Sequence, residues 1–160
     1  MQASNFRIRT VTTADRKQWD PLWQGYLRFY GSSLPDETTD LLWQRILDPE
    51  HEIDCRVAIE SDTGALLGLV HFFPHAHTWL AGRACYLNDL FVSPDTRGGG
   101  IGEALIEAVI DEARKQGWAE VFWMTQDHNA VARGLYDKLT GGSDGFVTYS
   151  IDVPNYRRPG

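Results

Sequence analysis

Residues 85–107 read CYLNDLFVSPDTRGGGIGEALIE, and this stretch decides the fold. Its first part, Cys85 to Val92, is a mostly apolar run that predicts a strand, and Ser93-Pro94-Asp95 ends that strand. Four glycines then fall within Gly98 to Gly102, directly before a helical pattern. A glycine-rich turn between a strand and a helix presents backbone N–H groups at the positive end of the helix dipole. The stretch therefore predicts an anion site, to which Arg97 adds a positive charge.

The spacing of these glycines argues against two other phosphate-binding loops. The pattern Gly-x-x-x-x-Gly-Lys-Ser/Thr is absent, and residues 100–105 lack the last glycine of the dinucleotide fingerprint. Pyrophosphate is the group that this turn fits best. The alternative is a tight turn without a ligand, for which four glycines in five positions are costly.

The flanking elements predict an α+β fold. Before the stretch, the patterns predict a strand over 6–11, helices over about 14–30 and 36–47, and two strands, 55–60 and 66–73, joined by the turn at 61–64. After it, they predict a helix ending at Gly117, a strand over 121–125, a helix from Asn129 to Leu139 and a last strand over 146–153. The sheet is then antiparallel in its first half, with a β-α-β crossover in its second.

Length and composition bound the class of protein. The 160 residues, 42% of them hydrophobic, predict one domain, with a folded core over 5–153 and a tail over 154–160. A net charge of -7 argues against a nucleic-acid partner, and no window approaches the ~18 apolar residues of a membrane span. Cys55 and Cys85 have no Cys-x-x-Cys spacing and are expected to be buried thiols, which together predicts a cytoplasmic protein.

The stretch and its surroundings resemble the GNAT superfamily of N-acetyltransferases. Arg97 to Gly102 matches the family's Arg/Gln-x-x-Gly-x-Gly/Ala signature, the apolar run 86–94 precedes it, and 127–139 follows at the family's distance. The resemblance covers 85–139 and is strongest to polyamine, diamine and histone/polyamine-type acetyltransferases. It implies an α/β/α layered fold with a sheet of about seven strands and about four helices. In that fold the parallel fourth and fifth strands splay around acetyl-CoA.

The resemblance also implies where the cofactor lies. The backbone of the fourth strand would hold the pantetheine arm, the glycine turn would wrap the pyrophosphate, and Asn129 and Tyr136 would lie near the thioester. Glu103 departs from the family pattern, because a carboxylate adds nothing to phosphate binding. The implied cofactor residues are Leu90, Phe91, Val92, Arg97, Gly98, Gly99, Gly100, Ile101, Gly102, Glu103, Asn129 and Tyr136, with no metal expected.

Two residues are the catalytic candidates under this resemblance. Tyr136 matches the family tyrosine that points at the CoA sulfur and could protonate the departing thiolate; the alternative is an aromatic that packs a short helix. An alkyl ammonium has a reference pKa near ~10.4 and must lose a proton before it attacks. Asp89, or a water held by Asn88 and Asp89, is the candidate for that path, and a carboxylate facing solvent is the alternative.

Aromatic and histidine side chains are weaker signals. Trp19, Trp23, Tyr26 and Tyr30 form one stripe of a helix, which predicts either core packing or the wall of an amine pocket through cation–π contact. The last three, with Asn88, are the substrate-binding candidates. The cluster His71, His75 and His77 could bind a metal or act as a base, but a role in solvent or at the edge of the substrate site is favoured.

The sequence thus predicts an N-acetyltransferase that moves an acetyl group from acetyl-CoA to a primary amine in a ternary complex. The expected acceptor is a small molecule or peptide that carries a cationic amine, polyamine or lysine-like group, and the expected assembly is a homodimer. A non-catalytic module that binds or senses acyl-CoA is the alternative, since it would keep the glycine turn without needing an acid or a base.

Overall fold

The computed structural model describes residues 5–160, which fall into two compact parts. One part extends to Met124, and the other runs from Thr125 to Gly160. The first part holds a five-stranded sheet in the order β1-β2-β3-β4-β5. Its strands are β1 (Phe6–Thr10), β2 (Asp54–Glu60), β3 (Leu66–His75), β4 (Ala84–Val92) and β5 (Glu120–Phe122).

The sheet confirms the predicted mixed topology. Strands β1 to β4 pair antiparallel, and β5 pairs parallel to β4 through the crossover helix. Residues 5–160 form five strands where about seven were expected.

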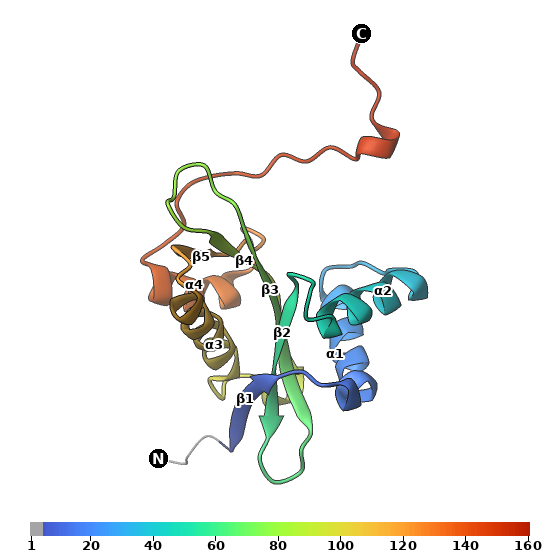
Figure 1. The fold of residues 1–160 in the computed structure, drawn as a ribbon, viewed down its shortest axis with the longest axis vertical. Coiled ribbons are helices and arrows are strands. Elements are labelled where there is room, and N and C mark those ends of the chain that lie inside the picture. Colours follow the sequence, from blue (N-terminus) through green and yellow to red (C-terminus); the bar gives the residue numbers. More distant parts are fainter. Residues whose placement is uncertain (1–4) are drawn as a thin grey trace. The chain divides into compact units, whose positions relative to one another are not determined.

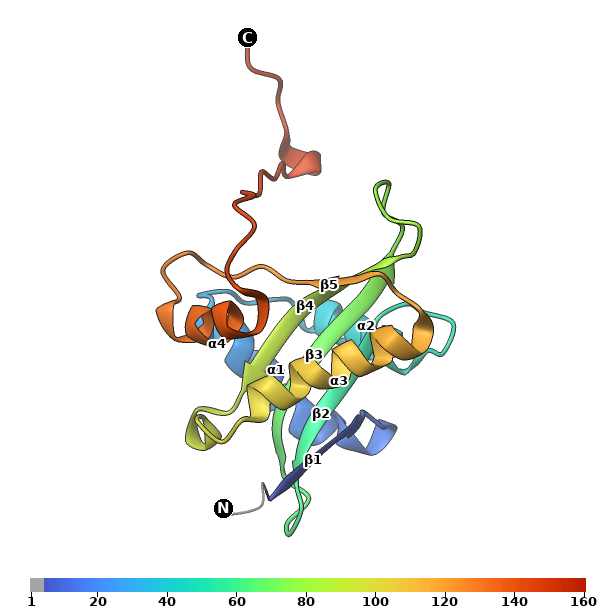
Figure 2. The same cartoon turned by 90° about the vertical axis from the view of Figure 1, so that its left-hand side faces the viewer.

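Three helices cover the two faces of this sheet (Figures 1 and 2). Helices α1 (Arg16–Phe29) and α2 (Asp36–Leu47) lie on one face, and α3 (Ile101–Gln116) lies on the other. Each helix buries one apolar stripe, as its periodicity predicts. The core on the α1 side contains Trp19, Trp23, Trp43, Ile46, Cys55, Leu69 and Phe91, and α3 buries Leu105, Ile106, Val109 and Ala113. Short 3₁₀ helices lie at Thr13–Asp15 and Pro94–Thr96.

A β-bulge in β4 decides which face its side chains reach. His71 pairs with Asp89, but the next residue of β3, Phe72, pairs with Leu87, so Asn88 is the extra residue. Side chains of successive strand residues point to opposite faces, and paired residues share a face. Phe72 contacts Trp118 next to α3, whereas His71 contacts Trp19 of α1. The bulge therefore turns Asp89 toward α1, while Leu87 stays on the face of α3.

A buried carboxylate fixes the entry into α1. Both Nη atoms of Arg9 donate to Asp15, at 2.6 and 2.8 Å, and the backbone N–H of Thr12 donates to the same carboxylate at 2.7 Å. The hydrogen bonds from Arg9 hold the pKa of Asp15 below its ordinary value of 3.8, against the opposing effect of burial. Because the folded pKa is depressed, this stabilisation is complete above about 3.8 and is lost as the pH falls through the folded value.

Replacing Asp15 by asparagine is therefore expected to lower the free energy of unfolding at pH 7 by about 1–2 kcal/mol. The loss should shrink as the pH falls below 4, where the wild-type carboxylate also becomes protonated. Urea unfolding of both chains from pH 2.5 to 7 measures this difference. Asp111→Asn, which removes an ion pair whose side chains are 71% exposed, should change stability by less than about 0.5 kcal/mol.

The second part, residues 125–160, contains α4 (Ala130–Thr140) and a 3₁₀ helix at Val153–Asn155. Asn129 is the N-cap residue of α4, as predicted. The predicted last strand over 146–153 is wrong: these residues are exposed and form no strand ladder. An alternating segment becomes a strand only where another strand meets its backbone. Among residues 5–160, no helix is long and apolar enough to cross a membrane.

Candidate active site

The parallel pair at the edge of the sheet opens after three residues. Strand β5 pairs with β4 only from Ala84 to Tyr86, and β4 continues to Val92 without a strand partner on this side among residues 5–160. Unpaired N–H and C=O groups of an extended strand can hydrogen-bond an extended ligand in place of a strand. Leu90, Phe91 and Val92, the predicted pantetheine contacts, lie in this unpaired part of β4.

The glycine turn joins the end of β4 to α3. Gly98 and Gly100 have positive φ angles of 84° and 79°, which favour glycine, and Gly100 is the N-cap of α3. A Cβ atom added to either residue would meet no heavy atom within 4 Å. The backbone of the turn is therefore open to a ligand. The first N–H groups of α3 point there and have no hydrogen-bond partner within the helix. Ile101 is buried and Gly102 and Glu103 follow it in the first turn.

The Arg97 side chain connects this turn to α1. Its Nε atom donates to the backbone oxygen of Val92 at 3.4 Å, and its guanidinium lies 5.9 Å from the ring centres of Phe29 and of Phe91. Phe91 in turn lies against Gly25 of α1, where an added Cβ would come within 2.8 Å of the ring. Cation–π contact on two rings orients the positive charge at the end of β4.

Asp89 is the centre of a buried hydrogen-bond network. Its side chain is 9% exposed, and its oxygens accept from His71 Nδ1 at 3.0 Å and from Asn88 Nδ2 at 2.8 Å. The hydroxyl of Tyr26 also hydrogen-bonds to Asp89. The structure therefore excludes the alternative in which Asp89 faces solvent, and places it with two substrate-binding candidates, Tyr26 and Asn88.

His71 is buried and joins Asp89 to α1. The indole N–H of Trp19 donates to His71 Nε2 at 3.1 Å. An indole nitrogen can only donate, so Nε2 accepts and the imidazole carries its proton on Nδ1, which faces Asp89. His71 is 2% exposed, so the prediction that it lies in solvent is wrong, and a role at the edge of the substrate site stays a prediction. The bulge brings Asp89 onto the same face as His71, which gives the buried imidazole its partner.

The aromatic stripe of α1 extends this network. Trp23 stacks on Tyr26 with ring centres 5.2 Å apart, and Tyr26 contacts Tyr30 at 5.0 Å. Burial, followed by the negative charge of Asp89 and the hydrogen bond to it, raises the pKa of Tyr26. Burial and the same charge raise the pKa of Tyr86 on β4. Trp19 and Trp23 belong to the core, which confirms core packing for this half of the stripe. Tyr26 and Tyr30 are partly exposed, and their role as the wall of an amine pocket stays a prediction.

Comparison with known proteins identifies the family of this chain. The model of the acetyltransferase (GNAT) family matches residues 19–141. The chain belongs to the GNAT family. It is an acetyltransferase, and it is 30% identical to the D-amino-acid N-acetyltransferase HPA3 of Saccharomyces cerevisiae over 153 residues, which are 96% of this chain and 90% of that protein.

Solved structures share the fold. The structure of a probable acetyltransferase superposes with a TM-score of 0.80 at 23% identity, covering 91% of this chain and 96% of that one. The structure of AAC(6')-Iy in complex with a bisubstrate analogue of CoA superposes with a TM-score of 0.78 at 18% identity, covering 96% and 98%. Both confirm the predicted GNAT class of fold.

Two residues that the resemblance implies near the thioester, Asn129 and Tyr136, lie in the second compact part. Asn129 is half-buried and donates from Nδ2 to Thr125 Oγ1 at 3.2 Å. Tyr136 is half-buried in the second turn of α4, and its backbone oxygen accepts from Thr140 Oγ1 at 2.9 Å. Their roles at the thioester stay predictions.

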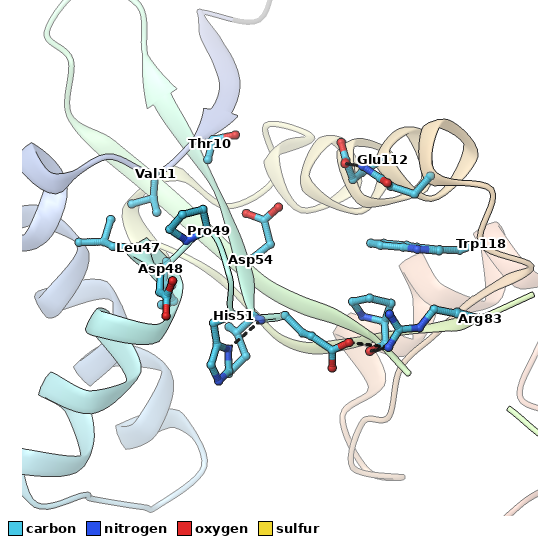
Figure 3. A pocket seen from close by; sticks show the side chains of 15 residues that line it. Thr10, Val11, Leu47, Asp48, Pro49, His51, Asp54, Arg83, Glu112 and Trp118 are labelled. Carbon is cyan, nitrogen blue, oxygen red and sulfur yellow. Dashed lines mark hydrogen bonds and ion pairs between the residues drawn. The ribbon is translucent and has the colours of Figure 1, made fainter. Parts of the chain in front are cut away.

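A cavity of about 510 Å³ lies elsewhere in this GNAT domain (Figure 3). Glu112 and Gln116, in the C-terminal half of α3, line the cavity. The whole of α3 is about 24 Å long, and the glycine turn lies at its other end. The charged groups of the cavity pair with nearby residues: Glu52 binds Arg83, and Arg56 links Asp54 to Glu112. The charged groups at this cavity therefore already have partners within the fold.

His71 is the functional candidate that the sequence did not place correctly. The signal was a lone histidine inside an apolar strand, opposite a second strand with Asn88 and Asp89 in an equally apolar run. Polar side chains that are buried in neighbouring strands need hydrogen-bond partners, and the polar side chain on the neighbouring strand is the nearest one available. His75 and His77 lie near one another, with ring centres 6.3 Å apart. His75 is four residues further along β3 than His71 and pairs with Ala84, so neither histidine belongs to the pair of His71 and Asp89. Among residues 5–160, no group of three or more His, Cys, Asp or Glu side chains could hold a metal ion.

Proposed function

We propose that this chain transfers an acetyl group from acetyl-CoA to a primary amine by direct attack in a ternary complex. The observation that supports this most is the unpaired edge of β4, which ends at the open turn of Gly98 and Gly100. The edge offers backbone partners to a pantetheine arm, and the turn offers N–H groups to a pyrophosphate. Arg97 adds a positive charge, while Glu103 in the first turn of α3 adds none.

The reaction needs two proton transfers. The acceptor ammonium must lose one proton before its nitrogen can attack the thioester carbonyl, and the thiolate that leaves must gain one. We assign the first transfer to the network of Asp89 and the second to the phenol of Tyr136. The first group lies on the face of α1 and β4, beside the unpaired edge.

The acceptor in this proposal is a small cationic amine, an amino acid, a polyamine or a lysine-like group. Tyr26, which stacks on Trp23, and its neighbour Tyr30 are partly exposed and offer cation–π contact, and Asp89 and the net charge of -7 favour a cation. The activity of the yeast relative, named for D-amino acids, adds amino acids to the candidates.

A test separates this enzyme from a module that only binds acyl-CoA. Thiol release from acetyl-CoA is followed with a panel of amines that includes D- and L-amino acids, polyamines and lysine peptides. Saturable turnover with one class supports the proposal. Tight binding of acetyl-CoA without turnover for any amine would contradict it and favour the binding module.

The glycine turn gives a specific test of the cofactor site. Gly100→Ala places a side chain at a positive φ, which costs about 1–2 kcal/mol, and bends the turn away from its open shape. We expect the affinity for CoA to fall about tenfold, measured by calorimetry. Gly64→Ala is the matched control, because Gly64 has a φ of 73° and equally open surroundings in the turn between β2 and β3. Equal CoA affinities of the two variants would contradict the assignment.

We also propose that the protein is a cytoplasmic homodimer. Val147, Tyr149 and Ile151 alternate along a segment outside any helix or strand and are all more than 60% exposed. Such a segment is suited to pairing with the sheet of another copy. Both cysteines are free and buried, which fits a reducing compartment. Sedimentation of the chain with and without residues 146–160 tests the dimer.

A further inference from the structure

We propose that Tyr26, Asp89, His71 and Trp19 form one proton-accepting relay, in which Tyr26 contacts the acceptor amine and His71 and Trp19 are positioning residues. The inference rests on the proposed acetyl transfer and names the residues that remove the first proton. The carboxylate of Asp89 accepts from three side chains, which leaves about one of its four acceptor positions unused. Its side chain is only 9% exposed, so an ammonium group outside the network reaches Tyr26 more readily than Asp89.

Tyr26 supplies that contact. Its ring is partly exposed, its neighbour Tyr30 is partly exposed too, and its hydroxyl donates to Asp89. A phenol oxygen can accept one hydrogen bond while its own proton is donated elsewhere. The ammonium N–H bond breaks as its proton passes to the Tyr26 oxygen, and the proton of Tyr26 passes to Asp89. Tyr26 stays neutral, Asp89 becomes a neutral acid, and the amine is free to attack.

The remaining protons balance. The neutral amine forms the C–N bond, the C–S bond breaks, and the second proton of the nitrogen ends on the thiol of CoA. Asp89 then returns its proton through Tyr26 to water. No oxidant, reductant or metal is needed for this step.

His71 keeps the relay charge-balanced because it is held neutral. Protonation of Nε2 would set two N–H donors against each other, since Trp19 already donates there at 3.1 Å. The imidazole therefore gives Asp89 a hydrogen bond without adding a cation that would keep its proton away. The other titratable groups that interact with Asp89 are Tyr26 of α1, Tyr86 of β4 and Cys55 of β2, and Tyr30, the residue after α1, acts on Tyr26.

The first arm of the test needs no substrate. Long-range ¹⁵N–¹H spectra of the imidazoles, assigned to His71 by the signals that His71→Asn removes, are recorded at pH 7. We expect the pattern of an imidazole that carries its proton on Nδ1 and accepts at Nε2. Trp19→Phe removes the donor to Nε2 and should shift the Nε2 signal. A His71 in the wild type that carries its proton on Nε2 would overturn the relay.

The second arm uses the full chain with an amine that the wild type acetylates. Tyr26→Phe is expected to lower kcat/KM for the amine at pH 7 by about 100-fold, with the KM for acetyl-CoA unchanged. The logarithm of its kcat/KM should rise with pH toward the pKa of the amine, because only the free amine then reacts. Tyr156→Phe makes the same chemical change in the tail and should leave the rate unchanged. A Tyr26→Phe profile parallel to that of the wild type would overturn the role of Tyr26.

Two substitutions of His71 separate positioning from packing. His71→Ala removes one hydrogen bond to a charged group and should lower kcat about 10- to 100-fold. His71→Asn restores a donor near Nδ1 and should recover most of that loss; equal loss in both variants would contradict the role. If the wild type acetylates no amine, the proposed function fails, and the imidazole spectra alone still decide whether the relay exists.

Discussion

Tyr136→Phe is expected to lower kcat by about 10²- to 10⁴-fold, the usual contribution of a positioned acid or base. The substitution removes only the phenol oxygen, so the ring keeps its place in α4. The proton of the phenol is needed when the thiolate leaves, and not when acetyl-CoA binds. Stopped-flow thiol release measures kcat, and calorimetry measures the affinity for acetyl-CoA, which should stay within about twofold of the wild type.

Tyr156→Phe again serves as the control, since it removes a phenol from the tail. An unchanged kcat in Tyr136→Phe would remove this residue from the mechanism. A lower affinity for acetyl-CoA with unchanged kcat would instead make Tyr136 a binding residue.

Trp19→Ala is expected to have the largest effect on stability. Trp19 is fully buried, contacts Trp23, Trp43 and His71 through its ring, and donates the hydrogen bond to His71. Loss of a buried tryptophan side chain costs about 3–5 kcal/mol, a large share of the 5–15 kcal/mol that stabilise an ordinary domain. Urea unfolding followed by circular dichroism measures the change in the free energy of unfolding.

Trp79→Ala is the control for this measurement. Trp79 is 82% exposed in the turn between β3 and β4, so its loss should change stability by less than about 0.5 kcal/mol. Trp19→Phe should lie between the two, because it keeps most of the packing and loses the N–H donor. Similar losses for Trp19→Ala and Trp79→Ala would show that the core on the α1 side is not built around Trp19.

The order of elements could be predicted because each signal is local. Periodicity and turn residues located α2 at Asp36–Leu47, and the run before Ser93 located β4. The start of α4 at Asn129 and the end of α3 at Gly117 were equally local signals. The segment 146–153 has the same alternation as a strand, but alternation does not say whether a neighbouring strand is present.

The relay could not be predicted because it depends on register. Asp89 and Asn88 were recognised as candidates, but which of them faces α1 depends on the extra residue in β4. A shift of one residue moves every following side chain to the other face, and nothing in the sequence of one strand fixes that shift. The contact of His71 with Asp89, and with it the link from Trp19 through His71 to Asp89, follows only once the pairing of β3 with β4 is known.

The extra residue in β4 also bears on how this strand can change in evolution. Substitution of Asn88 alters one exposed side chain and its hydrogen bond to Asp89. Deletion of one residue between Leu87 and Asp89 would instead exchange the faces of everything from Asp89 to Val92, moving Asp89 away from His71 and Phe91 away from Gly25. In homologous chains with the same relay, this position should therefore carry neither gaps nor insertions, even where its residue type differs.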